Sequence, residues 1–457
     1  MVVVDLGFGD AGKGSVIDFL ARRTAAHTVI RFNGGAQAAH NVITPDGRHH
    51  TFAQFGSATF LPGVQTYLSR YMLVEPYALF NEEQHLAALG VTDALDRLSI
   101  DRRALIITPF HQAANRLKEL ARGANRHGSC GLGIGETMAD ALADPSLALY
   151  AGDLPQRAAV MRRLQQVRDQ KFSEIEPLLP ALRELESDDE RATVQQALQL
   201  FDPGDLIEIV AENYVYLAER VTLVDDADWA VRLRQPGTIL FEGAQGVLLD
   251  ENYGFAPYTT WSTTTCANAD ALLNQAAYAG EIVRLGLWRA YFTRHGPGPF
   301  VTEDRALNEV LPEPHNGDSL WQRHFRRGYF DRVAARYALD VAGHIDELAI
   351  THLDAALPRP QWCYAYTSTQ PDLDPFFDLS VDHNQQVIKR IKVLPQPAQA
   401  HQTQLSQHLF HCQPLYEAIP DNTDDWLSAL ADWSGLPVTL TSWGPTANDK
   451  RVRCREQ

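Results

Sequence analysis

Short apolar runs alternate with stretches of helical spacing through the first third of this chain. The apolar run Met1–Leu6 is followed by the glycine-rich loop Gly7–Ser15, and Val16–Ala21 then takes up helical spacing. This order predicts a strand, a loop and a helix. Residues 58–150 repeat the rhythm, for example in the apolar run 104–108 and the helical segment that follows it to Ala121. Such alternation predicts an α/β fold with a mainly parallel β-sheet.

Further apolar runs predict strands at 28–32, 237–241 and 348–351. Between them, residues 155–220 are charged, rich in leucine and poor in glycine, and their apolar positions recur at helical intervals. We therefore expect a helical subdomain at about residues 155–225, within one domain that spans residues 1–457.

Composition narrows the function classes. The 457 residues include 45% hydrophobic side chains, which is typical of a globular protein. Forty basic and 57 acidic residues leave a net charge of −17, so we expect no nucleic-acid or anionic membrane partner. No secretory leader or long apolar run is visible, and we expect a cytoplasmic protein. Five cysteines without C-x-x-C spacing argue against a disulfide framework or a zinc site.

The loop Gly7–Ser15 has the composition of a phosphate-binding loop. Glycines let N–H groups approach a phosphate, and the following helix adds the positive end of its dipole. The loop nearly matches G-x-x-x-x-G-K-[ST], but Gly14 stands where a magnesium-binding hydroxyl should follow Lys13. Asp10 instead puts a carboxylate among the loop N–H groups, where we expect it to hold a metal or move a proton. The alternative is a glycine turn that binds nothing.

Three later polar positions are also candidates for chemistry. His40 follows the small-residue loop 33–39, where an imidazole can donate to a phosphate, shuttle protons or only stabilise the loop. The loop Gly128–Gly135 is either a flexible connector or a second anion-binding loop. Gln245 lies between glycines after a buried-type strand, where its amide can read an oxo group or a hydroxyl.

Several of these segments together resemble the adenylosuccinate synthetase family. Residues 9–14, G-D-A-G-K-G, are similar to the family signature G-D-E-G-K-G. Residues 241–250 repeat F-E-G-A-Q-G-x-L-L-D, and residues 290–300 match A-Y-x-T-R-x-G-x-G-P-F. Three ordered matches exclude coincidence. The resemblance implies a large central, mainly parallel sheet flanked by helices, with smaller helical and C-terminal subdomains, in a homodimer.

The resemblance also implies an activity, a GTP-dependent ligase. Such an enzyme phosphorylates the 6-oxygen of IMP or a related 6-oxopurine nucleotide and then joins an amine, aspartate by default, at C6. The catalytic residues it implies are Asp10, Lys13, His40 and Gln245. Magnesium is expected at Asp10 and Ala39. GTP is expected at Gly9, Gly12, Lys13, Gly14, His40, His352, Asp354, Ser442 and Gly444. The purine nucleotide and amino acid are expected at Gln37, Ser129, Cys130, Gln245, Thr260, Arg323 and Arg326.

The substrate loops depart from the family pattern. Cys130 replaces a hydroxyl residue and Leu132 an arginine in the segment similar to G-T-T-G-R-G-I-G. In the segment 318–331, Leu320 and Trp321 replace two threonines that grip aspartate, while Phe325 replaces an arginine. Phenylalanine cannot supply the arginine fork that recognises carboxylate.

These departures leave two alternatives open: a specialised paralogue with a non-standard nucleotide or amine donor, and a nucleotide-binding regulator with reduced catalysis. A P-loop kinase or GTPase switch is disfavoured, because Gly14 removes the magnesium hydroxyl.

Overall fold

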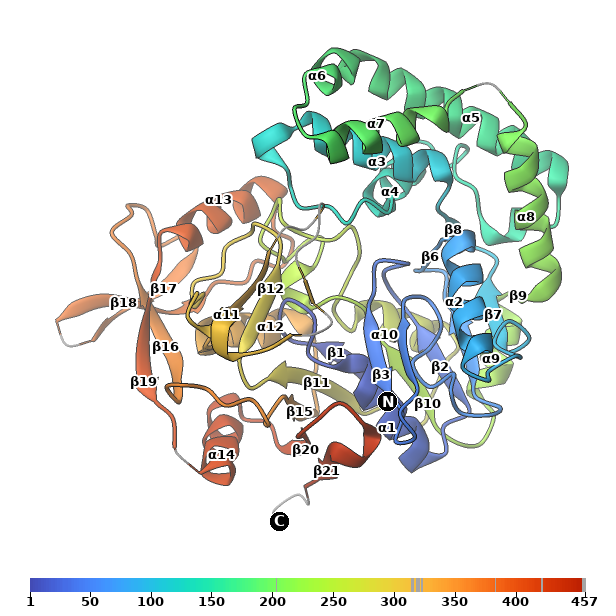
Figure 1. Cartoon of the computed structure of the whole chain (residues 1–457). Helices are drawn as coiled ribbons and strands as arrows, with labels where there is room; N and C mark the ends of the chain where they lie inside the picture. Colours follow the sequence, from blue (N-terminus) through green and yellow to red (C-terminus); the bar gives the residue numbers. More distant parts are fainter. Residues whose placement is uncertain are drawn as a thin grey trace.

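A ten-stranded sheet forms the centre of the computed structural model, which describes residues 1–202, 204–313, 316–317, 321, 324–382, 384–420 and 422–453. Every neighbouring pair is parallel except β20 and β21, so the predicted mainly parallel sheet is confirmed (Figure 1). In spatial order the strands are β21 (Lys450–Val452), β20 (Val438–Ser442), β15 (Glu347–Thr351), β11 (Arg284–Arg289), β1 (Val2–Asp5), β10 (Ile239–Glu242), β2 (Thr28–Arg31), β5 (Gln65–Leu68), β7 (Leu98–Asp101) and β9 (Thr222–Val224).

Smaller sheets lie around this centre. A five-stranded sheet near the C-terminus contains β14 (Phe330–Asp331), β16 (Gln361–Thr367), β17 (Phe377–Asp382), β18 (Gln385–Ile391) and β19 (Gln413–Ala418). Three two-stranded pairs are β3 (His40–Ile43) with β4 (His49–Phe52), β6 (Leu73–Val74) with β8 (Leu105–Ile106), and β12 (Phe292–His295) with β13 (Phe325–Gly328).

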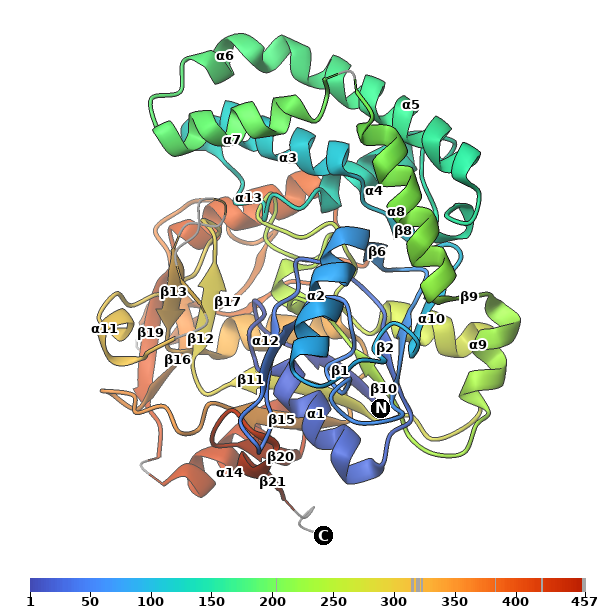
Figure 2. The same ribbon diagram turned by 45° about the vertical axis from the view of Figure 1, so that its right-hand side comes forward.

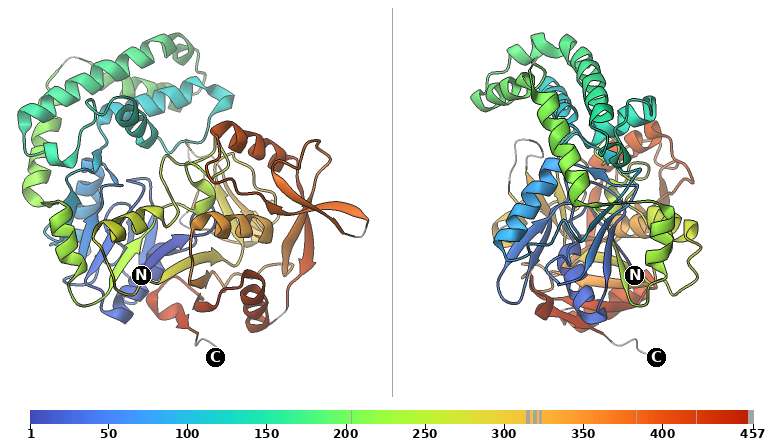
Figure 3. Two further views of the ribbon diagram at one scale, coloured as in Figure 1. Left: turned by 180° about the vertical axis from the view of Figure 1, so that it is seen from behind. Right: turned by 90° about the vertical axis from the view of Figure 1, so that its right-hand side faces the viewer.

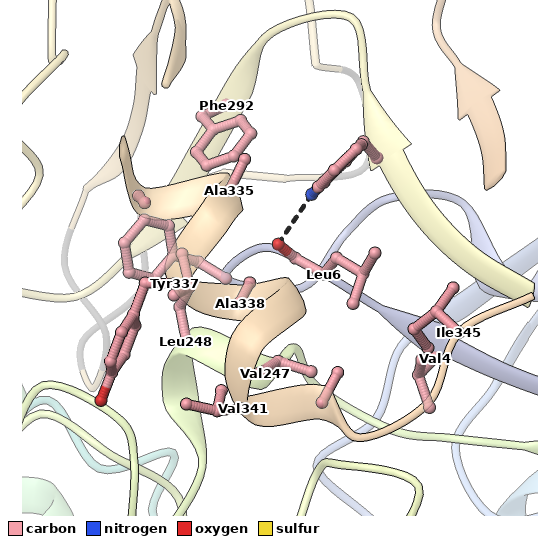
Figure 4. Close-up of a cluster of buried hydrophobic side chains, with 14 of the residues drawn as sticks. Val4, Leu6, Val247, Leu248, Phe292, Ala335, Tyr337, Ala338, Val341 and Ile345 are labelled. Atoms are coloured by element: carbon pink, nitrogen blue, oxygen red, sulfur yellow. Dashed lines mark hydrogen bonds between the residues drawn. The ribbon is translucent and has the colours of Figure 1, made fainter. Parts of the chain in front are cut away.

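Helices cover both faces of the central sheet. On one face, Val16, Ile17 and Leu20 of α1 (Lys13–Thr24) pack in a cluster with Val3 and Leu240 of the sheet. On the other face, α12 (Arg332–Ala342) packs against β1 and the residues that follow β10. Figure 4 shows Ala338 and Val341 of α12 near Leu6, Val247 and Leu248. In the neighbouring strand β11, Trp288 Nε1 donates to Leu6 O at 2.9 Å. Both faces of β1 are therefore buried, as expected for an interior parallel strand.

Half of the other helices in the described part of the chain form a layer above the sheet in Figures 1 and 2. The helices predicted in residues 155–220 are confirmed. They are α5 (Arg157–Ile175), α6 (Leu179–Arg183), α7 (Asp188–Gln199) and α8 (Leu206–Arg220). They pack with α3 (Pro109–Ala121) and α4 (Ile134–Ala143) (Figure 3). Their apolar side chains belong to a cluster that continues to Leu68 of β5 and to Leu98 and Ile100 of β7 in the central sheet. That these helices form a subdomain within one domain of residues 1–457 stays a prediction. The remaining helices are α2 (Pro76–Ala88), α9 (Asp226–Leu233), α10 (Ala267–Gln275), α11 (Leu307–Val310), α13 (Gln399–Phe410) and α14 (Thr423–Ser434).

Among the described residues, no helix combines the length and apolar character that crossing a membrane requires.

The parallel strands put their following loops at one edge of the sheet. The loops after β1, β2, β10, β11, β15 and β20 therefore meet there, although they are up to 440 residues apart in the chain. In open parallel sheets this edge is where ligands bind.

Candidate active site

A cavity of about 480 Å³ opens at this edge of the sheet. It brings together most of the residues predicted from the sequence: Gly9, Asp10, Gly12, Lys13, Gly14, Gln37, Ala39, His40, Gln245, His352, Asp354, Ser442 and Gly444. The first turn of α1 lines it with Lys13, Gly14 and Ser15. Gly12 precedes this turn in the left-handed conformation, and no described side chain caps the helix. An uncapped helix start behind a glycine loop is suited to an anion.

The carboxylate that accepts the loop amides is Asp5, which leaves the predicted role of Asp10 as metal ligand or base a prediction. Asp5 Oδ1 accepts from Gly7 N at 2.9 Å, and Oδ2 accepts from Ala11 N at 2.9 Å and Lys13 Nζ at 3.0 Å. Because Asp5 is fully buried, these bonds fix the loop and neutralise Lys13 in the free protein. Lys13 Nζ also donates to Gln245 O at 2.7 Å, which ties the β1 loop to the β10 loop.

Asp10 is free to face the cavity because its backbone turns outward. It has φ of +60°, and its carbonyl accepts from Arg289 Nη1 at 3.2 Å. Arg289 is itself buried and paired with Glu313, which also lines the cavity. The Asp10 carboxylate lies 3.5 Å from His295 Nε2. A carboxylate that is 24% exposed at a cavity can accept a proton or bind a cation.

His40 is held by a buried acid. Its Nδ1 donates to Glu242 Oε1 at 2.6 Å, and the amide of Ser57 donates to Glu242 Oε2 at 2.9 Å. Burial opposes ionisation of Glu242, but Arg31 and the bond from His40 outweigh it and lower its pKa to about 2. Burial lowers the pKa of His40 to about 4, against the effect of Glu242. The imidazole is therefore neutral near pH 7, with Nε2 left for a ligand in the cavity.

Gln245 is placed by a close approach of two loops. A side chain at Gly246 would put its Cβ 2.2 Å from Gly7 O, so only glycine lets the β10 loop lie against the β1 loop. Gln245 has φ of +55°, and its Oε1 is buried without a described hydrogen-bond partner. The side-chain Nε2 and Oε1 of Gln37 are also buried without a described hydrogen-bond partner. Unpartnered amide atoms at a cavity suit a ligand with its own donors and acceptors, such as a purine.

The far end of the cavity is built by the loops after β15 and β20. Leu353 N donates to Ser442 O at 3.1 Å, which joins the two loops beside Asp354. Lys450 Nζ donates to Gly444 O at 2.8 Å, and burial lowers the pKa of Lys450 to about 8 despite nearby carboxylates. His352 is neutral, because burial lowers its pKa well below the ordinary value.

Four of the predicted substrate residues do not line this cavity. Ser129 Oγ donates to Asn115 Oδ1 at 2.9 Å, and Cys130 packs beside the apolar cluster of Leu73 and Ile134. Thr260 N donates to Leu249 O at 2.8 Å. Arg326 donates to Gly296 O and Gly298 O, both at 2.6 Å, and pairs with Glu303. Arg323 lies outside the described residues. The substrate roles of these five residues stay predictions.

Sequence reasoning missed Asp5, Glu242, Arg289, His295 and Lys450. In the sequence, Asp5 and Glu242 each follow an apolar run that is typical of a buried strand. An acidic residue in such a run was the only signal of a buried, functional carboxylate.

Known proteins resemble this chain over nearly its whole length. The adenylosuccinate synthetase family model matches residues 2–451 of the chain. An adenylosuccinate synthetase of Marinomonas sp. is 30% identical and covers 99% of this chain and 98% of its own length. One from Clostridium beijerinckii is 27% identical, with 97% and 96% covered.

Solved structures show the same fold. The fully ligated adenylosuccinate synthetase of Plasmodium falciparum has a TM-score of 0.76 at 19% identity and covers 99% of each chain. The succinoaminodeoxyadenylate synthetase of cyanophage S-2L, bound to dGMP and to dATP as an energy donor, has a TM-score of 0.58 at 16% identity. It covers 99% of this chain and 94% of its own.

Proposed function

This chain belongs to the adenylosuccinate synthetase family, and from that premise we propose the roles of its residues in a GTP-dependent ligase reaction. Enzymes of this family use a purine nucleotide and an amino acid as substrates and form a C–N bond. The observation that carries the proposal is the convergence of Asp10, Lys13, His40 and Gln245, from the loops after three strands, in one cavity.

In the first half-reaction, Asp10 accepts the N1 proton of a 6-oxopurine while the 6-oxygen attacks the γ-phosphorus of GTP. GDP leaves, and a 6-phosphoryl purine results. The unpartnered amides of Gln245 and Gln37 support purine orientation by these residues. Because this transition state spreads charge over the phosphoryl oxygens, catalysis depends on positioned donors, which Lys13 and His40 supply.

His40 can donate only after it gains a proton at Nε2, since Nδ1–H is already bound to Glu242. An incoming triphosphate favours that proton because it brings negative charge to a buried imidazole. Glu242 therefore fixes the ring and stabilises the imidazolium that forms. In the second half-reaction an amine attacks C6 and phosphate leaves.

Magnesium fits the oxygen donors at the loop. Mg²⁺ is held in proteins by one or two carboxylates with carbonyl and phosphate oxygens, and Asp10 and the Ala39 carbonyl are donors of that type at the cavity. When bound, the ion supplies neutralisation of phosphate charge. At the far end, Asp354 would accept from the guanine N1–H and N2–H, beside His352, Ser442 and Gly444.

A second candidate, a paralogue with a non-standard nucleotide or amine, is favoured by Trp321. A Cβ at Gly131 would lie 3.0 Å from the Trp321 indole, so this ring covers the loop predicted to bind the substrate nucleotide. Together with the internal bonds of Arg326, this contact argues for a changed substrate pocket. A homodimer and a cytoplasmic location stay predictions.

Phosphate release tests the function and separates the two candidates. Purified protein is supplied with Mg²⁺, GTP or ATP, a panel of 6-oxopurine nucleosides and nucleotides, and a panel of amino acids. We expect phosphate release only when both a 6-oxopurine and an amine are present, with GTP preferred. Turnover with IMP and aspartate at ordinary rates would remove the paralogue. Nucleotide binding without phosphate release in every combination would contradict the ligase function.

A further inference from the structure

Lys450 is a buried lysine directly behind the loop that lines the far end of the cavity. It is the first residue of β21, lies opposite Ser442 of β20, and is only 6% exposed. Its Nζ donates to Gly444 O at 2.8 Å, and in the part of the chain that the structure describes no carboxylate forms an ion pair with it. Because lysine is rarely buried without a partner of opposite charge, this position calls for an explanation beyond packing.

The ammonium group of Lys450 carries its charge near pH 7. Burial lowers the pKa of Lys450 to about 8, while the negative charges of Asp449, Asp18 and Asp354 act to raise it. Asp18 already accepts a hydrogen bond from Arg22 at 2.9 Å. Asp354 lines the cavity, so a buried cation and a carboxylate both act on the same end of it.

The carbonyl groups at this end of the cavity are already used as acceptors. Gly444 O accepts from Lys450 Nζ and also from Ser442 Oγ, the latter at 3.1 Å. Ser442 O accepts from Leu353 N at 3.1 Å. A carbonyl oxygen has two lone pairs, so Gly444 O has no acceptor site left for a ligand. The carboxylate of Asp354 then remains as an acceptor at the cavity.

The fold fixes the loop in this position. A Cβ at Gly444 would lie 2.8 Å from Asp449 Cγ, so only glycine lets the loop lie against the turn that leads into β21. Trp443 N donates to Asp449 O at 3.0 Å on the other side of Gly444. Lys450 therefore meets a carbonyl whose place is set by the backbone on both sides.

This arrangement of charges and acceptors distinguishes guanine from adenine. Guanine presents N1–H and N2–H donors beside the acceptor O6, whereas adenine has an amino donor in the place of O6. A buried cation behind Gly444 stabilises the partial negative charge of O6 and repels the amino group of adenine. The filled carbonyl also leaves that amino group without an acceptor, which costs binding energy.

We propose that Lys450 is a positioning residue that selects guanine over adenine in the donor nucleotide, by filling the acceptor sites of Gly444 and placing positive charge behind it. This inference rests on the proposed function, in which the end of the cavity at Asp354 holds the base of GTP. Lys450 does not line the cavity and acts through Gly444.

The test compares Lys450→Met with Lys392→Met by calorimetric titration with GTP, ITP and ATP in the presence of Mg²⁺. Methionine removes both the donor and the charge. Lys392 is a matched control, because its Nζ donates to Asp374 O at 2.6 Å at an exposed site. The parent should bind GTP and ITP more tightly than ATP. We expect Lys450→Met to lose ~10- to 100-fold of this preference, and Lys392→Met to keep it.

ITP separates Lys450 from Asp354. It keeps O6 and N1–H but lacks the N2 amino group, so the preference for GTP over ITP reports on Asp354 and should stay unchanged in Lys450→Met. A lysine with only a structural role would instead weaken the binding of all three nucleotides by the same factor. Thermal unfolding checks that each variant is folded.

Three results would overturn the inference and leave the ligase function intact: an equal loss for all three nucleotides, an unchanged preference in folded Lys450→Met, and a parent that binds ATP as tightly as GTP. If Lys450→Met does not fold, Lys450→Gln keeps a donor without the charge and should lose part of the preference; full preference there contradicts the role of the charge. A parent that binds none of the three nucleotides would mean that the proposed function itself fails.

Discussion

At the residue scale, the hydrogen-bonded pair of His40 and Glu242 sets the charge that His40 can present to a bound triphosphate. Burial keeps the imidazole neutral and Arg31 keeps the carboxylate charged, although the two side chains share a 2.6 Å hydrogen bond. The free protein therefore holds a base that becomes cationic only when negative charge arrives. The cavity therefore gains the positive charge of His40 when a phosphorylated ligand binds, and does not carry that charge while it is empty.

The neutral His40 should make stability depend on pH. Unfolded histidine takes up a proton below pH 6.5, whereas His40 in the fold stays neutral down to about pH 4. The unfolded state then binds more protons across this window, so the free energy of unfolding falls as the pH falls. From pH 7 to pH 5 this group should cost about 2 kcal/mol.

Urea unfolding of the parent and of His40→Gln at pH 7 and pH 5 measures this contribution. Glutamine can still donate to Glu242 but does not titrate, so the variant should lose less stability on acidification. Equal losses in the two proteins would mean that His40 is already protonated in the fold.

Single residues of the site were predictable where the local pattern carried them. The glycine loop, His40 and Gln245 stand out because polar groups interrupt small or apolar runs. The partners were not predictable, since Glu242 lies 202 residues from His40 and meets it only because β10 pairs with β2. The role of Asp5 was not predictable, because the turn of the backbone decides which carboxylate accepts the loop amides.

At the scale of elements, the packing of α1 against β3 explains the departure at Gly14. A Cβ there would lie 2.9 Å from His40 Cβ and 3.0 Å from the backbone of Asn41, so the helix start and the strand touch at this point. The hydroxyl residue of an ordinary phosphate loop does not fit, and its place is taken by the strand that carries His40.

Gly14→Ser should therefore weaken the site although it restores the phosphate-loop pattern. We expect a loss of about 1–3 kcal/mol in unfolding free energy from overpacking, and weaker GTP binding because α1 and His40 move apart. Gly204→Ser is the control, since nothing lies within 4 Å of a Cβ at that position. Calorimetric titration with GTP and urea unfolding would measure both effects. Tighter GTP binding by Gly14→Ser would contradict this account.

Most elements of the central sheet followed from the alternation of apolar runs and helical stretches. β1, β2, β10 and β15 lie where the pattern predicts them, because each is a short apolar run bounded by glycine or polar residues. α1 lies where apolar residues take up helical spacing. The hairpin of β12 and β13 was not predictable, since its two strands are separated by a long segment. His295 therefore appeared in the sequence only as a variable position of a family motif.

At the scale of the whole molecule, the site exists only because the sheet gathers six loops at one edge. The net charge of −17 does not favour a triphosphate, so binding depends on the local arrangement of Lys13, His40 and the start of α1. These groups come from the first 40 residues, whereas Asp354, Ser442 and Gly444 at the other end of the cavity come from the last quarter of the chain. The sequence shows the motifs and their order along the chain. That they meet in one cavity could be seen only in the folded structure.

The most direct test of the central claim is the turnover of Asp10→Asn. With GTP, Mg²⁺, and the purine and amine that support phosphate release, the parent should turn over and the variant should lose ~10²- to 10⁴-fold in kcat while it still binds GTP. Asparagine keeps the size of the side chain but cannot accept the N1 proton. A variant that binds GTP and releases phosphate at the parent rate would contradict the assignment of Asp10 as the base.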